Sequence, residues 1–280
     1  MSRNLPRERH FSELNTSVSL VVFLLALTYT CFAGKLLEPI FGKWASPFFS
    51  FGLALLPLLV AIFFRLDIKN IFRCNRMGLG QIAGGIVLSA GLLIFVLLAS
   101  GFIAVFFPGV PVSGKNIGTN VLDQNIFRVV LSIAVMPAIS EEFLFRGFIL
   151  SGFALAFPKR KSIILCALLF ALLHLEPLQV PFAFLVGIGL SWVALETGSI
   201  WIPILMHAFH NLALLLIARG IASLVFVFPR ASDFTKLSEI VLAGVSVLVA
   251  ALVSFILIRL GISLVSRTSR VPPATEISEE

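Results

Sequence analysis

Apolar stretches about as long as a membrane is thick recur along the whole chain. Hydrophobic residues make up 59% of the 280 residues and charged residues only 12%, whereas a soluble domain is about half apolar and about a quarter charged. A water-soluble core cannot hide so much apolar surface, so lipid must be the solvent for a large part of it. The sequence therefore predicts an all-α fold, a polytopic transmembrane helical bundle.

About eight stretches reach or approach the roughly 20 apolar residues that a helix needs to cross a bilayer. They are Ser17–Gly34, Ser46–Phe64, Gln81–Phe107, Val129–Leu150, Ser162–Leu175, Val180–Leu195, Ile200–Ile217 and Ile240–Ile258. The fifth and sixth are short and closely spaced, and we expect a tight hairpin of two spans rather than one re-entrant unit. The first is longer than a usual signal-peptide core, so we interpret it as an uncleaved anchor.

These stretches divide the chain into five parts. We expect a cytoplasmic tail (1–16), N-terminal transmembrane helices (17–125), a core that holds the intramembrane polar residues (126–217), an external loop with the last transmembrane helix (218–265), and a cytoplasmic tail (266–280). The last part is polar and carries two adjacent prolines, which is typical of a disordered segment.

The basic residues predict the orientation in the membrane. Thirteen of the 21 lysines and arginines fall on the side that both termini share, seven fall on the opposite side, and Arg146 lies within a span. Lysine and arginine accumulate in cytoplasmic loops, so we expect both termini in the cytoplasm, at the inner membrane of a bacterial cell. The basic residues are spread over short loops rather than gathered in a patch, so no nucleic-acid partner is expected despite the net charge of +7.

Three of the predicted spans contain polar residues that are costly to place in lipid. They are Glu141, Glu142 and Arg146 in the fourth span, His174 in the fifth, and His207, His210 and Asn211 in the seventh. Each ionised group at the centre of a span costs at least about 2.5–3.5 kcal/mol, so such residues are functional candidates. At a rise of about 1.5 Å per residue, all three spans place these groups about 12–18 Å from the cytoplasmic end. A common depth favours one shared site.

Local spacing suggests what these residues do. Glu142 and Arg146 are four residues apart, so they share a helix face and can form an ion pair. Glu141 points about 100° away from Glu142, and it is the carboxylate left as a candidate general base. His207 and Asn211 also share a face and suit stabilisation of an oxyanion, or metal ligation in the case of the histidine.

Two further residues are less specific. His210 lies on a different face from His207, and a structural role is favoured for it. Pro137 lies four residues before Glu141 and removes a backbone hydrogen bond, which predicts a kink in the fourth span. The kink would open a water pocket at the carboxylates, or it would serve packing alone.

Three motifs in this part of the chain resemble the CPBP family of intramembrane peptidases, also called the CAAX-protease/bacteriocin-processing or ABI family, which includes the type II CAAX prenyl endopeptidases. The motifs are Glu141-Glu142-Phe-Leu-Phe-Arg146, Phe170-Ala-Leu-Leu-His174 and His207-Ala-Phe-His-Asn211. The resemblance covers approximately 126–213 and leaves out the N-terminal third and the last span.

The resemblance implies an endopeptidase that cuts a membrane-associated or lipidated protein or peptide within or beside the membrane. By analogy, Glu141 and His174 would activate water, His207 and Asn211 would stabilise the oxyanion, and Glu142 and Arg146 would support the geometry. The family has been described both as glutamate proteases and as metalloproteases. We favour a metal-free site, without a cofactor, because Glu142, the alternative base, is placed to pair with Arg146. The alternative is a divalent metal such as zinc, with Glu141, His174 and His207 as candidate ligands.

Two other functions fit the same residues. Carboxylates and histidines at mid-depth also build the proton relays of coupled carriers, although the sequence has no internal repeat. A non-catalytic scaffold or bacteriocin-immunity protein would use the polar groups to hold helices together. The sequence leaves the substrate open between a prenylated CaaX tail, a bacteriocin leader and a sorting signal.

Overall fold

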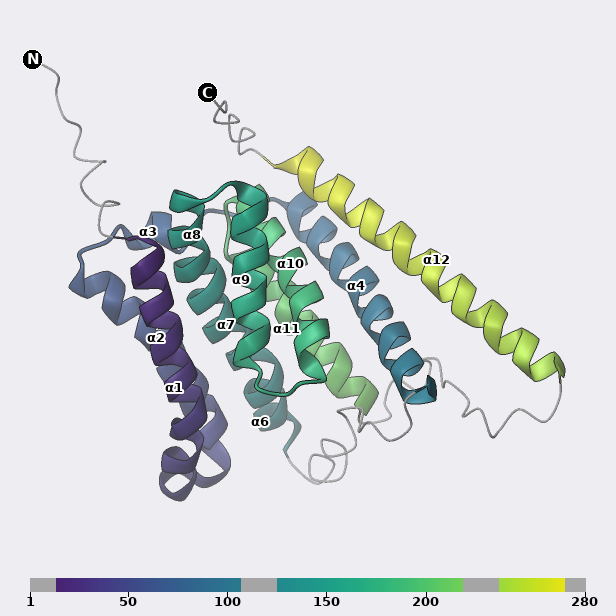
Figure 1. Ribbon diagram of the computed structural model, residues 1–280, viewed down its shortest axis with the longest axis horizontal. Coiled ribbons are helices and arrows are strands. Elements are labelled where there is room, and N and C mark those ends of the chain that lie inside the picture. Colours follow the sequence, from purple (N-terminus) through teal and green to yellow (C-terminus); the bar gives the residue numbers. More distant parts are fainter. Residues whose placement is uncertain (1–13, 107–124, 219–236, 270–280) are drawn as a thin grey trace, which may run out of the picture.

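The protein is a bundle of helices in the computed structural model, which describes residues 14–106, 125–218 and 237–269 (Figure 1). The elements are α1 (Thr16–Phe41), η1 (Gly42–Trp44), α2 (Ala45–Phe63), α3 (Ile68–Ile71), α4 (Leu79–Phe106), α6 (Ile126–Val130), η2 (Leu131–Val135), α7 (Met136–Glu142), η3 (Phe143–Ile149), α8 (Leu150–Ala156), α9 (Lys159–Leu173), α10 (Gln179–Thr197), α11 (Trp201–Ala218) and α12 (Leu237–Thr268). The predicted all-α class is confirmed, and no strand occurs within the described ranges.

Helices occupy all eight of the predicted stretches. Four segments are long and apolar enough to cross a membrane by length and composition: Thr16–Phe63, Leu79–Ile103, Gln179–Thr197 and Gly244–Thr268. The first of them contains both α1 and α2, which fold back on each other at the η1 turn (Figure 1). The chain is therefore an integral membrane protein.

Some helix ends differ from the predicted ones. The fourth span extends from Ile126 to Ala156 as five consecutive helical segments. α12 continues to Thr268, so the first residues of the predicted tail 266–280 are helical, and the Thr268 carbonyl accepts a hydrogen bond from Gln81 on α4. Residues 1–13 of the predicted N-terminal tail, most of the predicted external loop (219–236) and residues 270–280 lie outside the described residues.

Polar side chains and one glycine determine where several helices begin and end. The Asn15 side chain accepts the N–H of Val18 at 3.0 Å and starts α1. Asn125 likewise accepts the N–H of Phe127 at 2.9 Å and starts α6. Such caps satisfy donors that have no partner within the helix. Gly198, with a φ of 62°, ends α10 in the left-handed conformation that a residue with a Cβ adopts only at a cost.

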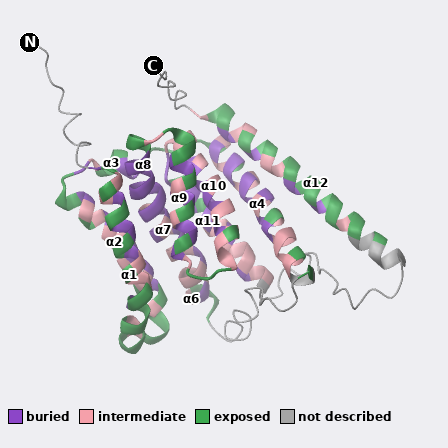
Figure 2. Ribbon diagram, in the orientation of Figure 1, coloured by how far each residue is buried: buried purple, intermediate pink, exposed green. Residues whose placement is uncertain are grey.

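The most deeply buried helix is the one formed by α7, η3 and α8. Every residue from Leu144 to Phe153 is buried, and Figure 2 shows the region of α8 in purple. α12, by contrast, exposes large apolar side chains along most of its length, as expected for a helix that faces lipid. The intramembrane polar residues of the fourth span therefore lie in the protein interior.

Glycines allow α4 and α12 to pack closely. A Cβ on Gly261 of α12 would lie 2.5 Å from the backbone nitrogen of Leu88, and a Cβ on Gly91 of α4 would lie 2.9 Å from the backbone nitrogen of Ile258. These contacts involve backbone atoms, which cannot move aside as a flexible side chain can. Small residues at such a seam let helices approach closely in a membrane, where packing rather than hydrophobicity holds them together.

We expect Gly261→Val to loosen the contact between α4 and α12 and to lower stability by about 1–3 kcal/mol, the usual cost of overpacking. The measurement is thermal unfolding of the detergent-solubilised protein. Gly244→Val, on the same helix but with nothing within 4 Å of the added Cβ, is the matched control. Equal melting temperatures for the two variants would contradict the close approach.

Candidate active site

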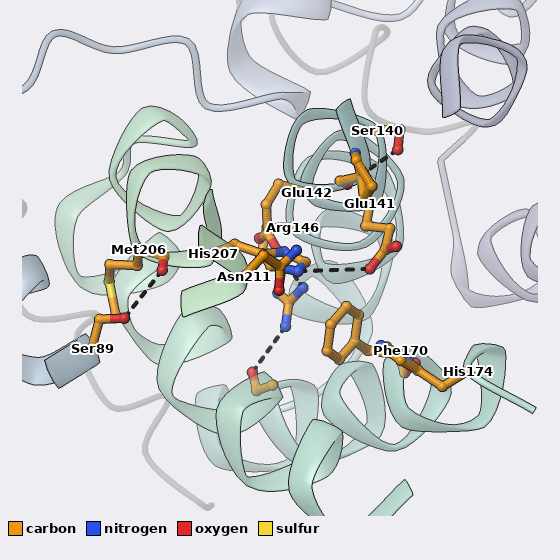
Figure 3. Close-up of polar contacts among 12 residues, drawn as sticks. Ser89, Ser140, Glu141, Glu142, Arg146, Phe170, His174, Met206, His207 and Asn211 are labelled. Atoms are coloured by element: carbon orange, nitrogen blue, oxygen red, sulfur yellow. Dashed lines mark hydrogen bonds and ion pairs between the residues drawn. The ribbon is translucent and has the colours of Figure 1, made fainter. Parts of the chain in front are cut away.

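The helical segments bring polar residues from three separate spans to one place in the bundle (Figure 3). The fourth span contributes Glu141, Glu142 and Arg146, the C-terminal end of α9 contributes His174, and α11 contributes His207, His210 and Asn211. The common depth inferred from the sequence thus corresponds to a common location, with the structure deciding which of these side chains touch.

Two π-helical turns flank the carboxylates. η2 precedes α7 and η3 follows it, and α7 carries Glu141 and Glu142 at its end. π-helical turns in α-helices occur frequently at functional sites, because the wider turn changes which side chains face the same direction. The kink expected at Pro137 stays a prediction; the structure has π-helical backbone at Leu131–Val135, just before this residue.

Asn211 contacts the backbone that Pro137 leaves without a donor. Proline has no N–H to offer the carbonyl four residues earlier, which belongs to Ile133. The Asn211 Nδ2 donates to this carbonyl oxygen at 3.3 Å. Asn211 therefore ties α11 to the irregular turn beside the carboxylates, a role that its spacing from His207 did not predict.

Glu142 holds together the interior of the site. Its Oε1 accepts a hydrogen bond from Arg146 Nη1 at 2.7 Å and contacts His207 Nδ1 at 2.8 Å. The side chains of Glu142 and Arg146 are both 0% exposed, so the predicted i,i+4 pair is confirmed and fully buried. Arg146 also donates to the Gly187 carbonyl at 3.2 Å, which joins α10 to the same cluster.

Glu141 occupies a different environment from Glu142. Its carboxylate lies at the cavity, its side chain is 19% exposed, and its Oε2 is 3.9 Å from His207 Nε2. This distance exceeds that of a hydrogen bond, and Oε2 makes no hydrogen bond with any described residue. Oε2 of Glu142 also lacks a hydrogen-bond partner among the described residues, but Glu142 does not line the cavity. Glu141 is thus the carboxylate placed to meet a water or a substrate.

The hydrogen bond of His174 determines which ring nitrogen is available. Its Nδ1 lies 3.0 Å from the Phe170 carbonyl, which can only accept, so the neutral ring carries its proton on Nδ1 and a lone pair on Nε2. Leu175 follows with a φ of 56° and ends the helix, a left-handed conformation that costs about 1–2 kcal/mol for a residue with a Cβ. α9 therefore ends where the imidazole reaches the site.

Phe170 connects the two halves of the site, and its role was not predicted from the sequence. Its ring packs edge-on against the rings of His174 and His207, with centroid distances of 4.9 and 5.7 Å. The guanidinium of Arg146 lies 4.2 Å from the same ring centroid, a favourable cation–π arrangement. The sequence signal for Phe170 was its place as the first residue of the second motif, one turn before His174.

A cavity of about 610 Å³ adjoins these side chains. Its polar lining includes Glu141, His174, His207, His210 and Asn211, and most of the remaining lining is apolar. Glu142 and Arg146 are absent from the lining because they lie behind His207 and Phe170. The structure therefore separates the residues that can meet a substrate from those that support them.

His210 was given a structural role from the sequence, but its surroundings differ from those of a satisfied core histidine. The residue is 6% exposed, its Nδ1 has no hydrogen-bond partner among the described residues, and its ring borders the cavity. A buried polar atom without a partner costs about 1–3 kcal/mol. Its position at the cavity is the reason to include it among the site residues.

The candidate metal ligands Glu141, His174 and His207 do not form a metal-type cluster. In the described parts of the chain, no group of three or more His, Cys, Asp and Glu side chains has a suitable arrangement. His207 directs Nδ1 to Glu142, and the ring of Phe170 packs against both histidines. We derive no step through a metal.

Replacing Arg146 with Ala should destabilise the protein by about 3–5 kcal/mol, because it leaves Glu142 as an unpaired buried charge. The level of folded protein in the membrane and its melting temperature in detergent measure the effect. Lys159→Ala is the matched control, since it breaks the surface ion pair with Glu196, worth at most about 1 kcal/mol. A similar loss of stability in both variants would show that the buried pair stabilises the protein no more than the surface pair does.

Comparison with known proteins identifies the segment that holds this site. No curated protein and no solved structure gives a significant match to the chain. Residues 123–213 match the family model described as type II CAAX prenyl endopeptidase Rce1-like, and this range includes all three motifs. The predicted resemblance is therefore confirmed for this segment, which contributes Glu141, His174 and His207: it is similar to the Rce1-like type II CAAX prenyl endopeptidases, and at the level of the family this similarity supports an intramembrane endopeptidase.

Proposed function

We propose that the protein hydrolyses a peptide bond of a membrane-associated protein or peptide, with Glu141 as the general base. The observation that carries the proposal is that Glu141, His174, His207 and Asn211 all line one cavity inside an apolar bundle. An unpartnered carboxylate oxygen and an imidazole lone pair at one cavity are the two groups needed to activate a water molecule.

The charges of the cluster support this assignment. Glu141 and Glu142 together carry two negative charges when ionised, and Arg146 supplies one positive charge. A protonated His207 would make the cluster neutral, and it lies within 3.9 Å of both carboxylates. The imidazolium would then face the cavity with its Nε2–H.

In the proposed step, Glu141 removes a proton from water while His174 Nε2 accepts the water's second hydrogen bond and orients it. The water oxygen bonds to the carbonyl carbon of the substrate, and the π electrons of the carbonyl move to its oxygen. The negative charge passes from Glu141 to this oxyanion, where the protonated His207 stabilises it. Collapse of the tetrahedral intermediate breaks the C–N bond, and the leaving amine takes the proton from Glu141.

Asn211 and His210 would assist at the same oxygen. The Asn211 amide carries two hydrogens, of which one is used by the Ile133 carbonyl and the other is available to the oxyanion. The His210 ring borders the cavity without a hydrogen-bond partner among the described residues. Both residues therefore support the substrate or the oxyanion, whereas Glu142 and Arg146 position His207 from behind.

Glu141→Gln is expected to abolish cleavage while the protein still accumulates in the membrane, because the amide keeps the shape of the side chain and removes the base. The measurement compares the lengths and amounts of membrane peptides, by mass spectrometry, between cells with the wild-type protein and cells with the variant. The matched control is Glu176→Gln, an exposed carboxylate in the loop after His174, which should leave the peptide pattern unchanged.

If the Glu141→Gln variant and the wild-type protein gave identical peptide patterns, the peptidase proposal would fail. The polar cluster would then serve a scaffold, an immunity protein or a proton-coupled carrier, the functions that the same residues also fit.

Removal of metal ions should leave the activity intact. The purified protein, dialysed against a chelator in detergent, is assayed on a peptide identified by the comparison above. The reason is that no group of three or more His, Cys, Asp and Glu side chains in the described parts of the chain is arranged to hold a metal ion. Activity lost on chelation and restored by zinc alone would replace the glutamate route with a metal-dependent one.

A further inference from the structure

The cavity lies entirely in one half of the bundle. We define the terminus end as the end at which α1 begins, at Thr16, and α12 finishes, at Thr268 (Figure 1). α4 and α11 both run away from this end, and they line the cavity with Val96–Ile103 and His207–Ile217. Ile103 lies about 36 Å along α4 from Leu79, and Ile217 about 24 Å along α11 from Trp201, at about 1.5 Å per residue. The cavity therefore extends from the site toward the end opposite the termini.

The other helices that line the cavity agree. α10 runs toward the terminus end, and its contribution comes from its first half, up to Val186. The fourth span runs in the same direction and contributes Ile133, Pro137 and Glu141, which all precede its buried half. Two helices that run away from the terminus end and two that run toward it thus all place the cavity between Glu141 and the end opposite the termini.

Toward the terminus end, packed side chains close the site. The residues that follow Glu141 on this side, from Leu144 to Phe153, are all buried, and Phe72 is 0% exposed against them. A Cβ on Gly147 would lie 2.5 Å from the ring of Phe72, so no space is left there. A substrate cannot pass through this layer without its unpacking.

Arg73 fastens the layer to the rest of the terminus end. Its Nη1 donates to the Arg146 carbonyl at 2.6 Å and to the Ser151 hydroxyl at 2.7 Å, and its own carbonyl accepts the N–H of Ile200 at 3.0 Å. Desolvation by this packing lowers the pKa of Arg73 to about 10, so the guanidinium keeps its charge at neutral pH. Arg73 therefore holds this layer to the rest of the terminus end.

The remaining basic residues indicate which end faces the cytoplasm. Within the described ranges, the half of the bundle at the terminus end carries Arg65, Lys69, Arg76, Lys159, Arg160, Lys161, Arg259 and Arg267, whereas the opposite half carries Lys35, Lys43 and Arg128. Lysine and arginine are enriched in cytoplasmic loops of membrane proteins. The closed end of the site is therefore the cytoplasmic one.

We infer that the substrate enters the site from the non-cytoplasmic side of the membrane. The identification of the ligand as a substrate rests on the proposed peptidase function, whereas the side of the membrane toward which the cavity extends does not depend on it. Because most of the lining is apolar, the chemistry favours an apolar polypeptide segment that is exposed at, or embedded in, the non-cytoplasmic leaflet. A soluble cytoplasmic protein with a modified C-terminal tail would meet the closed layer instead.

The sidedness can be tested with single cysteines and a membrane-impermeant maleimide. The background carries Cys31→Ser, Cys74→Ser and Cys166→Ala, which removes all three natural thiols. Glu176→Cys marks the exposed loop beside the cavity-lining Leu178, and Lys161→Cys marks an exposed position at the terminus end. In right-side-out spheroplasts we expect Glu176→Cys to react and Lys161→Cys to react only after detergent is added. The reverse pattern would overturn the inference.

A second arm connects the sidedness to the substrate route. In the same background, Ser100→Cys places a thiol in the cavity lining. The impermeant reagent added to spheroplasts should reduce cleavage by this variant to the level of Glu141→Gln and leave the Lys161→Cys variant active. Unchanged cleavage after reaction from outside would overturn the substrate route. Failure of the peptidase function would show differently, as absence of cleavage by every variant with the labelling pattern intact.

Discussion

The site depends on a single oxygen atom, Oε1 of Glu142, which contacts both Arg146 and His207. A charged pair buried in a membrane protein is tolerated only when its partners are close and well oriented. This carboxylate joins the fourth span to α11, and Arg146 extends the contact to the Gly187 carbonyl on α10. The three helices must therefore keep these relative positions for the buried charges to remain paired. The packing of the bundle and the orientation of His207 are therefore consequences of the same interaction.

The irregular backbone around this atom likewise affects both the packing of the helices and the orientation of the site residues. η2 and η3 interrupt the regular turn of the fourth span on both sides of the carboxylates, and Pro137 removes a donor that Asn211 partly replaces from α11. As a result, Glu142 points into the packed interior while the neighbouring Glu141 points into the cavity. Two adjacent glutamates thus acquire different environments, which is the condition for giving one a structural role and the other a chemical role.

The apolar bundle leaves the polar cluster accessible from one side only. Packed aromatic rings and Arg73 close the cluster at the terminus end, and the cavity extends the other way. In such an environment, electrostatic interactions are stronger than in water, so the sum of the charges on Glu141, Glu142, Arg146 and His207 matters more here than it would at a protein surface. The transfer of negative charge from Glu141 to an oxyanion would leave the sum unchanged, which limits the reorganisation that the step requires.

The sequence by itself determined the membrane-spanning helices, the Glu142–Arg146 pair and the three motifs, because each depends on composition or on spacing within one helix. The tertiary structure decided the contact of His207 with Glu142, the position of Phe170 between the two histidines, the inward turn of Arg73, and the side on which the cavity lies. Helices in lipid are apolar on both their lipid-facing and their protein-facing sides, so the hydrophobic pattern does not show which faces meet. Contacts between residues of different helices, such as these, follow only from the packing of the whole bundle.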